Sequence, residues 1–338
     1  MKAAALFSIL LLFSSCIDDP SVTSIPGQFQ QEYQLLWNLF DRNYVGFALS
    51  GVDWNALFNT YMEMAEQVDI REKMTEMELL LLENLCDRNI KLISPGGNLL
   101  NAYQPDVFVN CDSSVLMSYL IPEGFQWIQQ DIWGYCIAGD DSVPYFVVKS
   151  WSSELNLSLL DNILQPLSEK EAMILDIRLA EGHSTGTAHN LARRFAGEQT
   201  VGHMTQRRVN TSTWELTAPA PVYLIPRGWF FQGEVILLAG QRNSGISEVF
   251  ACDMSSLPSV TLVGDTTAGS GNLQSLVRQL PDGWYVTCPT VTLLTSDTVI
   301  VENTGVLPDV AVNATAEDFQ NGSDPVLEKA FSLLEAQM

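Results

Sequence analysis

Apolar residues recur at helical spacing in the segment that follows residue 27. Two runs place large side chains at intervals of three and four positions, which lines one face of a helix. These runs are Tyr33, Leu36, Trp37, Phe40 and Trp54, Leu57, Phe58, Tyr61. Asp53 is suited to cap the second helix, and a third helix is predicted from about Arg71 to Cys86. The pattern therefore predicts a helical bundle over residues 28–93.

The pattern changes to short alternating runs between residues 94 and 145. Val107-Phe108-Val109 and the run at 134–138 are separated by Gly, Asp and Pro, which is typical of strands and turns. Because this segment is too short for a further complete domain, we predict a short β connector over residues 94–145.

Buried strands alternate with helices in the last part of the chain. Continuous apolar runs, typical of strands covered on both faces, lie at 172–177, 233–239 and 260–263. Helices are predicted at 187–195, 247–256 and 325–336. Strand–helix–strand order indicates parallel crossover units, so residues 146–338 are predicted to form an α/β domain.

The N-terminus has the pattern of a bacterial lipoprotein signal peptide over residues 1–15. A short positive start precedes an apolar run at 3–13, which is too short to span ~30 Å of hydrocarbon. Two serines and Cys16 follow, and the Cys16 thiol would receive lipid and become the mature N-terminus. An ordinary secretory signal with an incidental cysteine is the alternative. Residues 16–27 are then a polar tether.

The expected location is the bacterial cell envelope, with the membrane contacted only through the lipid anchor. No later segment of the sequence is long and apolar enough to span a bilayer. Asp18 and Asp19, just after Cys16, favour the outer membrane or cell surface of a Gram-negative bacterium.

Charge narrows the range of partners. The chain carries 40 acidic against 17 basic residues, a formal net charge of −23, and no local Lys/Arg cluster reverses this balance. Such a surface repels phosphate backbones, which excludes nucleic-acid binding. The five cysteines after Cys16 show neither CxxC nor Cys/His metal-ligand spacing, so we expect five buried thiols, with one disulfide as the alternative. They are Cys86, Cys111, Cys136, Cys252 and Cys288.

Six segments, in order, resemble the S41 family of serine peptidases, the tail-specific or C-terminal-processing peptidases. They are GVDW at 51–54, LCDRNIKL at 85–92, LDIR and EG within 175–182, SGISE at 244–248, LPSVTLVGDTTAG at 257–269 and ENTGVLPD at 302–309. The similarity covers roughly residues 30–335 and is strongest to lipoprotein members that lack a PDZ domain. It implies a ClpP/crotonase-like α/β domain over residues 146–338, peptide ligands and no cofactor.

The resemblance also locates the positions that carry the family's chemistry. The nucleophilic serine lies at a strand-to-helix turn, three residues before an acidic residue, and here that position is Gly245. The family's Asp-Gly-His becomes Asp87-Arg88-Asn89, and an asparagine cannot accept a proton near neutral pH. The lysine base of the other branch falls on Ser270.

The sequence also differs from the family at the oxyanion-binding turn, and it keeps one acidic position of the family without the residues that accompany it. The oxyanion-binding turn has Ala180, Gly182 and His183 where family members have an Asn and paired Gly. Glu302 matches an acidic position that orients a base or closes the site. Without those partners we interpret Glu302 as a loop carboxylate.

Other serines and histidines offer alternative catalytic groups. Ser244 or Ser247 could be the nucleophile in a shifted register, although Ser247 is better suited to cap a helix. His183 could approach the site as a base, whereas a solvated or packing role fits it better. The other two histidines of the chain are His189 and His203. The spacing of the three histidines is scattered and predicts no metal site.

The sequence supports two functions from different classes. The first is an inactive S41 homologue that keeps a groove for an extended peptide or an envelope protein. The second is an active serine endopeptidase that uses Ser244 or Ser247 with a non-standard base. Loss of nucleophile, base and oxyanion turn together favours the first. In either case Asn89 and Gly245 should face each other where the bundle meets the α/β domain.

Overall fold

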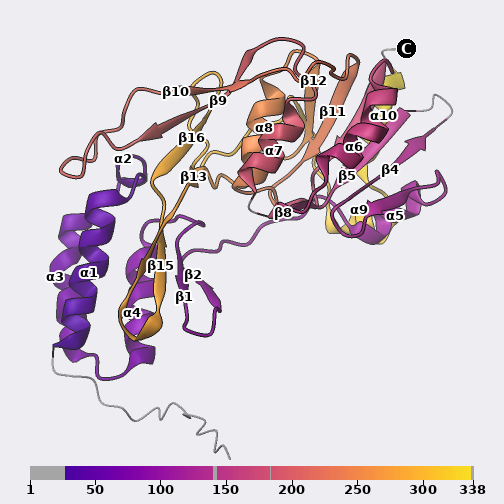
Figure 1. The fold of residues 1–338 in the computed structure, drawn as a ribbon. Coiled ribbons are helices and arrows are strands. Elements are labelled where there is room, and N and C mark those ends of the chain that lie inside the picture. The colour runs from indigo at the N-terminus through magenta and orange to yellow at the C-terminus, as the bar shows by residue number, and fades with distance from the viewer. Residues whose placement is uncertain (1–26, 140–142, 183, 336–338) are drawn as a thin grey trace, which may run out of the picture.

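The computed structural model describes residues 27–139, 143–182 and 184–335. Cys16 and His183 therefore lie outside the described residues. The described part of the chain starts with the three predicted helices, which stand side by side in Figure 1. They are α1 (Gln28–Asn43), α3 (Trp54–Gln67) and α4 (Arg71–Glu83). The short α2 (Phe47–Ser50) lies between α1 and α3 and was not predicted. Asp53 caps α3 as predicted, because its carboxylate accepts a hydrogen bond from the Ala56 amide.

The helical part also contains a small sheet that the periodicity did not predict. Its strand order is β14-β15-β1-β2, so two strands from late in the sequence cross into the N-terminal part (Figure 1). The strands are β1 (Lys91–Ile93), β2 (Leu99–Asn101), β14 (Leu276–Gln279) and β15 (Tyr285–Cys288). Three-residue strands are too short to show alternation, and their pairing with distant segments decides their structure.

A seven-stranded sheet forms the centre of the α/β part, with strand order β17-β12-β11-β7-β5-β4-β3. Its strands are β3 (Gln126–Gln129), β4 (Trp133–Ala138), β5 (Val143–Val148), β7 (Ala172–Asp176), β11 (Glu234–Ala239), β12 (Val260–Gly264) and β17 (Val310–Ala311). The pairings from β17 to β5 are parallel, which confirms the predicted crossover units, and β4 and β3 are antiparallel.

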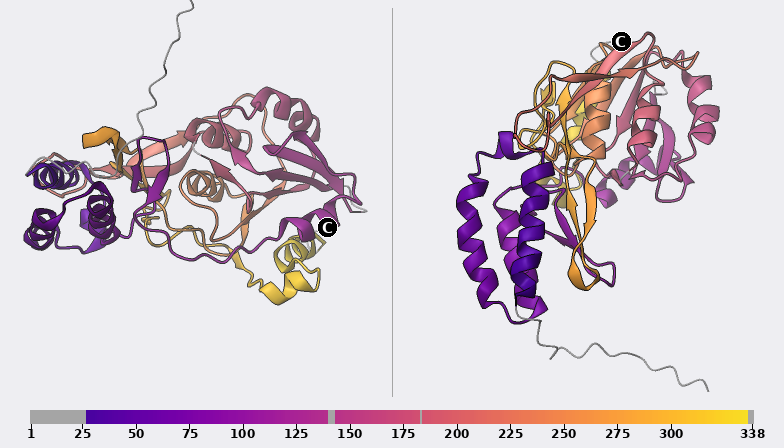
Figure 2. Two further views of the ribbon diagram at one scale, coloured as in Figure 1. Left: turned by 90° about the horizontal axis from the view of Figure 1, so that it is seen from below. Right: turned by 60° about the vertical axis from the view of Figure 1, so that its left-hand side comes forward.

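Helices cover both faces of this sheet, and alternate residues of each strand face opposite layers. Leu175 and Leu237 pack in the core under α6, α7 and α8, whereas Ile174 and Ile236 pack under α5 and α10 (Figures 1 and 2). The helices are α5 (Ser113–Leu120), α6 (Leu157–Leu164), α7 (Thr185–Ala192), α8 (Ile246–Ser255) and α10 (Pro325–Glu335). A shorter α9 (Ala316–Gln320) precedes α10.

A second four-stranded sheet, ordered β10-β9-β16-β13, packs on the outer side of α8. Its strands are β9 (Thr200–Arg207), β10 (Ala220–Leu224), β13 (Asn272–Leu273) and β16 (Val291–Thr295). The β9–β10 connection reaches the helical part, where the Trp214 and Phe47 rings lie 4.7 Å apart between centroids (Figure 1). A short pair joins β6 (Ser150–Trp151) to β8 (Glu181–Gly182).

Several expectations for the middle of the chain were wrong. The segment predicted as a connector contributes β3 and β4 to the seven-stranded sheet, because β4 pairs along its whole length with β5. Val107-Phe108-Val109 has no strand structure, and a helix, α5, lies where none was expected. All five described cysteines are free, and Cys86 is exposed rather than buried because its positive φ of 50° belongs to the turn after α4.

The Asp-x-Arg segment at the end of β7 is structural. Arg178 is fully buried, and its guanidinium donates hydrogen bonds to Asp176 and Asp324 at 2.8 Å each. It also donates to the Asn110 carbonyl at 2.9 Å. The arrangement ties the end of β7 to the start of α10, because a buried guanidinium requires acceptors on every side.

Candidate functional site

Gly245 occupies the turn between β11 and α8 in a backbone conformation that suits glycine. Its φ is 56° and its ψ is −104°, a region in which L side chains are strained. A Cβ placed on Gly245 would have Asn89 Oδ1 and Leu273 Cδ2 as its nearest neighbours, both at 4.0 Å. The turn is therefore open on the side that faces Asn89, and Asn89 and Gly245 face each other as predicted.

The Asn89 side chain links the helical part to the loop after β12. Its Nδ2 donates hydrogen bonds to Ser270 Oγ at 2.8 Å and to the Asn272 carbonyl at 2.6 Å. Because only the amide nitrogen can donate to a carbonyl, these contacts leave Oδ1 as the atom directed at Gly245. The three positions singled out in the sequence, Asn89, Gly245 and Ser270, thus lie together although they come from three distant segments.

Glu248, on the first turn of α8, fixes the positions of Gly245 and the loop. Its carboxylate accepts hydrogen bonds from the Gly245 amide at 2.9 Å, the Gly269 amide at 2.6 Å and the Ser270 amide at 2.8 Å. The Thr267 hydroxyl donates to the same carboxylate at 2.7 Å. Burial raises the pKa of Glu248, and these four donors oppose that effect.

Asp87 joins the turn after α4 to the same loop. Its Oδ1 accepts the Asn89 amide at 2.8 Å, and its Oδ2 accepts the Tyr44 hydroxyl at 3.0 Å and Asn272 Nδ2 at 2.9 Å. Burial raises the pKa of Asp87 to about 6, although all three donors favour the ionised form.

Glu302 lies in a loop, as interpreted from the sequence, but it is a buried member of this group. It is 5% exposed, and its Oε2 accepts the Asn272 amide at 2.8 Å. Burial, followed by the charge of Asp87, raises the pKa of Glu302 to about 9. Its carboxyl is therefore protonated at neutral pH. Sequence position alone could not show this burial, because the surrounding residues come from the helical part and the β12–β13 loop.

The two alternative serines differ sharply in environment. Ser247 is buried as the second residue of α8, so the expectation that it caps the helix was wrong, and Gly245 is the N-cap. Its hydroxyl accepts a hydrogen bond from Trp151 Nε1 at 2.8 Å and donates one to the Ala180 carbonyl at 3.1 Å. Ser244 is exposed, and none of the described side chains forms a hydrogen bond with its hydroxyl.

The turn at Gly182, which the resemblance aligns with the family's oxyanion turn, lies against β6. Gly182 pairs with Trp151 and has a φ of 127°, and a Cβ there would lie 2.9 Å from Trp151 backbone atoms, so this glycine is required by close packing. A polar pocket of about 350 Å³ borders this turn. It is lined by Asp131, Lys149, Ser150, Leu179, Glu181, Gly182 and Arg242.

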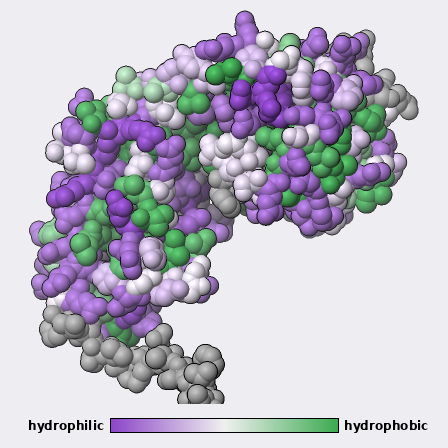
Figure 3. All heavy atoms as spheres, in the orientation of Figure 1, coloured by the Kyte–Doolittle hydropathy of each residue, from purple (hydrophilic) through white to green (hydrophobic). Residues whose placement is uncertain are grey.

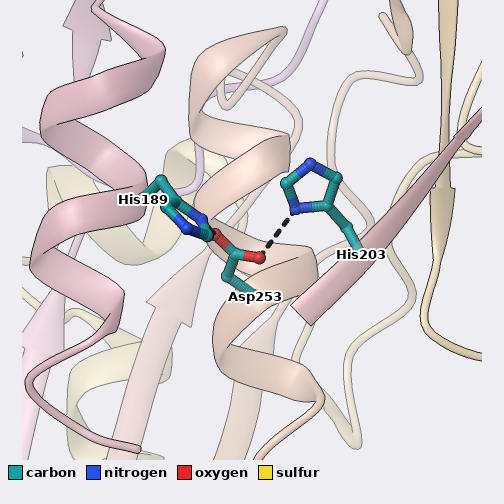
Figure 4. A group of neighbouring side chains, drawn as sticks. All are labelled: His189, His203 and Asp253. Atoms are coloured by element: carbon teal, nitrogen blue, oxygen red, sulfur yellow. Dashed lines mark hydrogen bonds and ion pairs between the residues drawn. The ribbon is translucent and has the colours of Figure 1, made fainter. Parts of the chain in front are cut away.

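A second group of ionisable side chains lies on α7, α8 and β9. His189 Nδ1 and His203 Nδ1 each contact the carboxylate of Asp253, at 2.8 and 2.7 Å (Figure 4). The histidines are scattered in sequence, yet two of them meet at one carboxylate in the fold. Sequence analysis missed Asp253, because no local spacing signals a contact between residues 50 and 64 positions apart.

Comparisons of the sequence and of the structure with known proteins identify the same family. The sequence profile of peptidase family S41 matches residues 142–312. None of the helices in the described part of the chain is long and apolar enough to cross a membrane.

Solved structures of the same fold include a candidate peptidase from Parabacteroides merdae, with a TM-score of 0.81 and 27% identity over 92% of this chain and 97% of that one. A lipoprotein from Streptococcus agalactiae has a TM-score of 0.61 and 13% identity, over 94% of this chain and 100% of that one. A photosystem II D1 C-terminal processing protease has a TM-score of 0.57 and 16% identity, over 86% and 94%. With helices at the N-terminus, a mixed α/β domain and a family profile matched over half its length, this chain belongs to peptidase family S41.

Proposed function

We propose that the protein is a non-hydrolysing S41 homologue, lipid-anchored in the cell envelope, that binds an extended peptide or a partner's peptide segment. The observation that carries this proposal is Gly245 at the turn where the family's nucleophile belongs. Covalent catalysis requires a hydroxyl at that turn and a base within ~3 Å to remove its proton. Gly245 supplies no hydroxyl, and Asn89 and Ser270, its neighbours, supply no base.

The amide orientation of Asn89 supports the same conclusion. Both of its Nδ2 hydrogens are engaged by Ser270 and Asn272, so the atom facing Gly245 is an amide oxygen. An amide oxygen accepts hydrogen bonds but is not basic enough to take a proton from a hydroxyl near neutral pH. A backbone or side-chain donor of a bound peptide is a better partner for it.

Glu302 gives an electrostatic argument for inactivity. An acidic residue that orients a catalytic imidazole is stabilised as an anion by the imidazolium that forms during reaction. Here the neighbour is the neutral Asn89, and burial with Asp87 nearby raises the pKa of Glu302 to about 9. A neutral carboxyl cannot stabilise a positive base, so this acidic position no longer serves proton transfer.

The surroundings of Gly245 favour an extended ligand. β13 is an edge of its sheet in the described structure, and Leu273 of this strand lies beside Gly245. An edge strand can pair with an added peptide strand through main-chain hydrogen bonds. The pocket next to Gly182 adds polar side chains, with Lys149 paired to Asp131 and Arg242 paired to Glu181 along its lining. The outline of the molecule is concave between its helical and α/β parts (Figure 3).

The anchoring proposal rests on the lipoprotein-like pattern that ends at Cys16 and on the apolar run that precedes it. Asp18 and Asp19 favour the outer membrane or cell surface. One structural neighbour, from Streptococcus agalactiae, is itself described as a lipoprotein.

Wild-type protein should not react with a fluorophosphonate probe, because in the described structure neither Ser244 nor Ser247 has a base in contact with its hydroxyl. We expect no labelling at a probe concentration that fully labels an active S41 peptidase measured in parallel. Labelling of the wild type that disappears in Ser244→Ala or Ser247→Ala would establish the alternative, an active serine peptidase, and identify its nucleophile.

A large side chain at residue 245 should block peptide binding. Gly245→Leu would fill the open space facing Asn89, and we expect at least about tenfold weaker binding of apolar extended peptides by calorimetry, about 1.4 kcal/mol. Gly97→Leu is the matched control, because Gly97 also has positive φ, at 82°, and open space around its Cβ position. Equal binding by the two variants would place the peptide elsewhere.

Glu302→Gln should change the pH dependence of stability. The folded state keeps the Glu302 proton up to about pH 9, whereas the unfolded chain releases it near the ordinary value of 4.5. Wild-type stability therefore falls as pH rises between these values, and the variant is spared that loss. Urea unfolding should show the variant gaining more than about 1.4 kcal/mol over wild type between about pH 5 and about pH 9. The control Glu317→Gln changes an exposed carboxylate on α9, and its free energy of unfolding should follow that of the wild type at every pH. The prediction would be contradicted if Glu302→Gln also followed the wild type.

Lipid attachment should depend on Cys16 alone. In a Gram-negative host fed labelled palmitate, the wild type and a Cys86→Ser control should incorporate label, because Cys86 has no signal sequence before it. Cys16→Ala should incorporate none. An unlabelled wild type, or a labelled Cys16→Ala variant, would rule out the lipoprotein proposal.

A further inference from the structure

Three ionisable side chains from three separate elements converge on the side of α8 remote from Gly245. His189 lies on α7, His203 on β9 and Asp253 on α8, and one donor atom from each lies within 4.8 Å of the others (Figure 4). His189 Nδ1 contacts Asp253 Oδ2 at 2.8 Å, and His203 Nδ1 contacts Oδ1 at 2.7 Å. The two rings are nearly perpendicular, at 88°, so they approach the carboxylate from different directions.

The carboxylate of Asp253 is buried without a permanent cation. Asp253 is 0% exposed, and in the described structure its only ion-pair partners are the two histidines. Asp176 and Asp324, which are equally buried, both pair with Arg178. A buried charge is costly unless it is paired or coordinates a metal ion, so this carboxylate favours a cation between the two rings.

Two features of the backbone show that the position of the carboxylate is built into the fold. A Cβ on Gly202 of β9 would lie 2.1 Å from Asp253 Oδ1, so a glycine is needed for the carboxylate to reach this strand. Asp253 also stands in the last turn of α8, where the helix dipole disfavours a negative charge. The fold thus requires a glycine at residue 202 and places a negative charge where the helix dipole disfavours it. A bound cation would offset the unfavourable interaction with the dipole.

We propose that His189, His203 and Asp253 form a binding site for a divalent transition-metal ion of the Zn²⁺ class. Two imidazoles and a carboxylate are donors that Zn²⁺ prefers, and three protein ligands leave a position for water. The ion takes the Nδ1 lone pair of each ring, which then carries its proton on Nε2. Donors of such an ion lie ~2.0–2.2 Å from it, so on binding each imidazole would rotate off its hydrogen-bonded Asp253 oxygen and direct Nδ1 at a common point. Solvent reaches the site past His189, whose side chain is 22% exposed.

The site is separate from the S41 site. Asp253 follows Gly245 by eight positions along α8, a rise of about 12 Å. The ion would instead connect α7, α8 and β9, and so join the helical layer of the α/β part to the second four-stranded sheet. Its role is therefore to hold the two layers together, and it does not depend on whether the protein binds peptides.

Zinc titration of the full chain in detergent, after removal of metals with EDTA, tests the proposal. Calorimetry with ZnCl₂ near neutral pH should show one ion per chain with micromolar or tighter affinity, and bound Zn²⁺ should raise the thermal midpoint. Asp253→Asn and the double variant His189→Ala/His203→Ala should each bind at least about tenfold more weakly. His189→Ala alone should also weaken binding, and its partly exposed position makes it the variant least prone to misfolding.

Two control variants exclude other ligands. Cys86→Ser removes the exposed thiol and His183→Ala removes the remaining histidine, and both should bind Zn²⁺ as the wild type does. Absence of saturable binding to the wild type would overturn the proposal and leave the group as a hydrogen-bond network. Undiminished binding by Asp253→Asn and by folded His189→Ala would overturn it too, by placing the ion elsewhere.

Discussion

The carboxylate of Glu248 organises the S41 site, because it holds the turn at Gly245 against the loop after β12. It accepts the amide of Gly245 at the start of its own helix and the amides of Gly269 and Ser270 in the loop after β12. Satisfying a buried carboxylate with four donors fixes these donors relative to one another. The loop then carries Ser270 and Asn272 to Asn89 and Asp87, and in this way α8 determines where the helical part docks.

Because of this dependence, the position of the turn does not require a side chain at residue 245. None of the hydrogen bonds around Glu248 uses a side chain at residue 245, so glycine there breaks no contact. A serine held at φ of 56° would instead be strained by about 1–3 kcal/mol, a cost that an enzyme accepts for reactivity. Replacement by glycine removes that strain, and the position of the turn is still set by Glu248. Stability and catalysis are thus separable at this turn.

The local sequence pattern predicted the main helices and the buried parallel strands. It could not predict features that depend on contacts between distant segments. The helices around Tyr33 and Trp54 and the buried parallel strands follow from spacing and apolar runs, and the positions of Asn89 and Gly245 follow from the family resemblance. The strand at 91–93 pairs with a strand almost 200 positions later, and Glu302 is buried against Asn272, 30 positions earlier, and neither contact leaves a local signal. The same holds for Asp253, which becomes informative only once α7, α8 and β9 are packed.

Buried carboxylates without arginine or lysine partners are stabilised in two different ways in this molecule. Around Gly245, burial raises the pKa of Asp87 to about 6, and burial together with the charge of Asp87 raises the pKa of Glu302 to about 9. Protonation relieves the cost of burial, and a carboxyl that keeps its proton is a poor cation ligand. Asp253 has no carboxylate neighbour in its group and has two imidazoles instead, whose nitrogen lone pairs can be shared with a cation. Near neutral pH Glu302 therefore keeps its proton while Asp87 remains largely ionised, and Asp253 has two imidazoles beside it instead of a neighbouring acid.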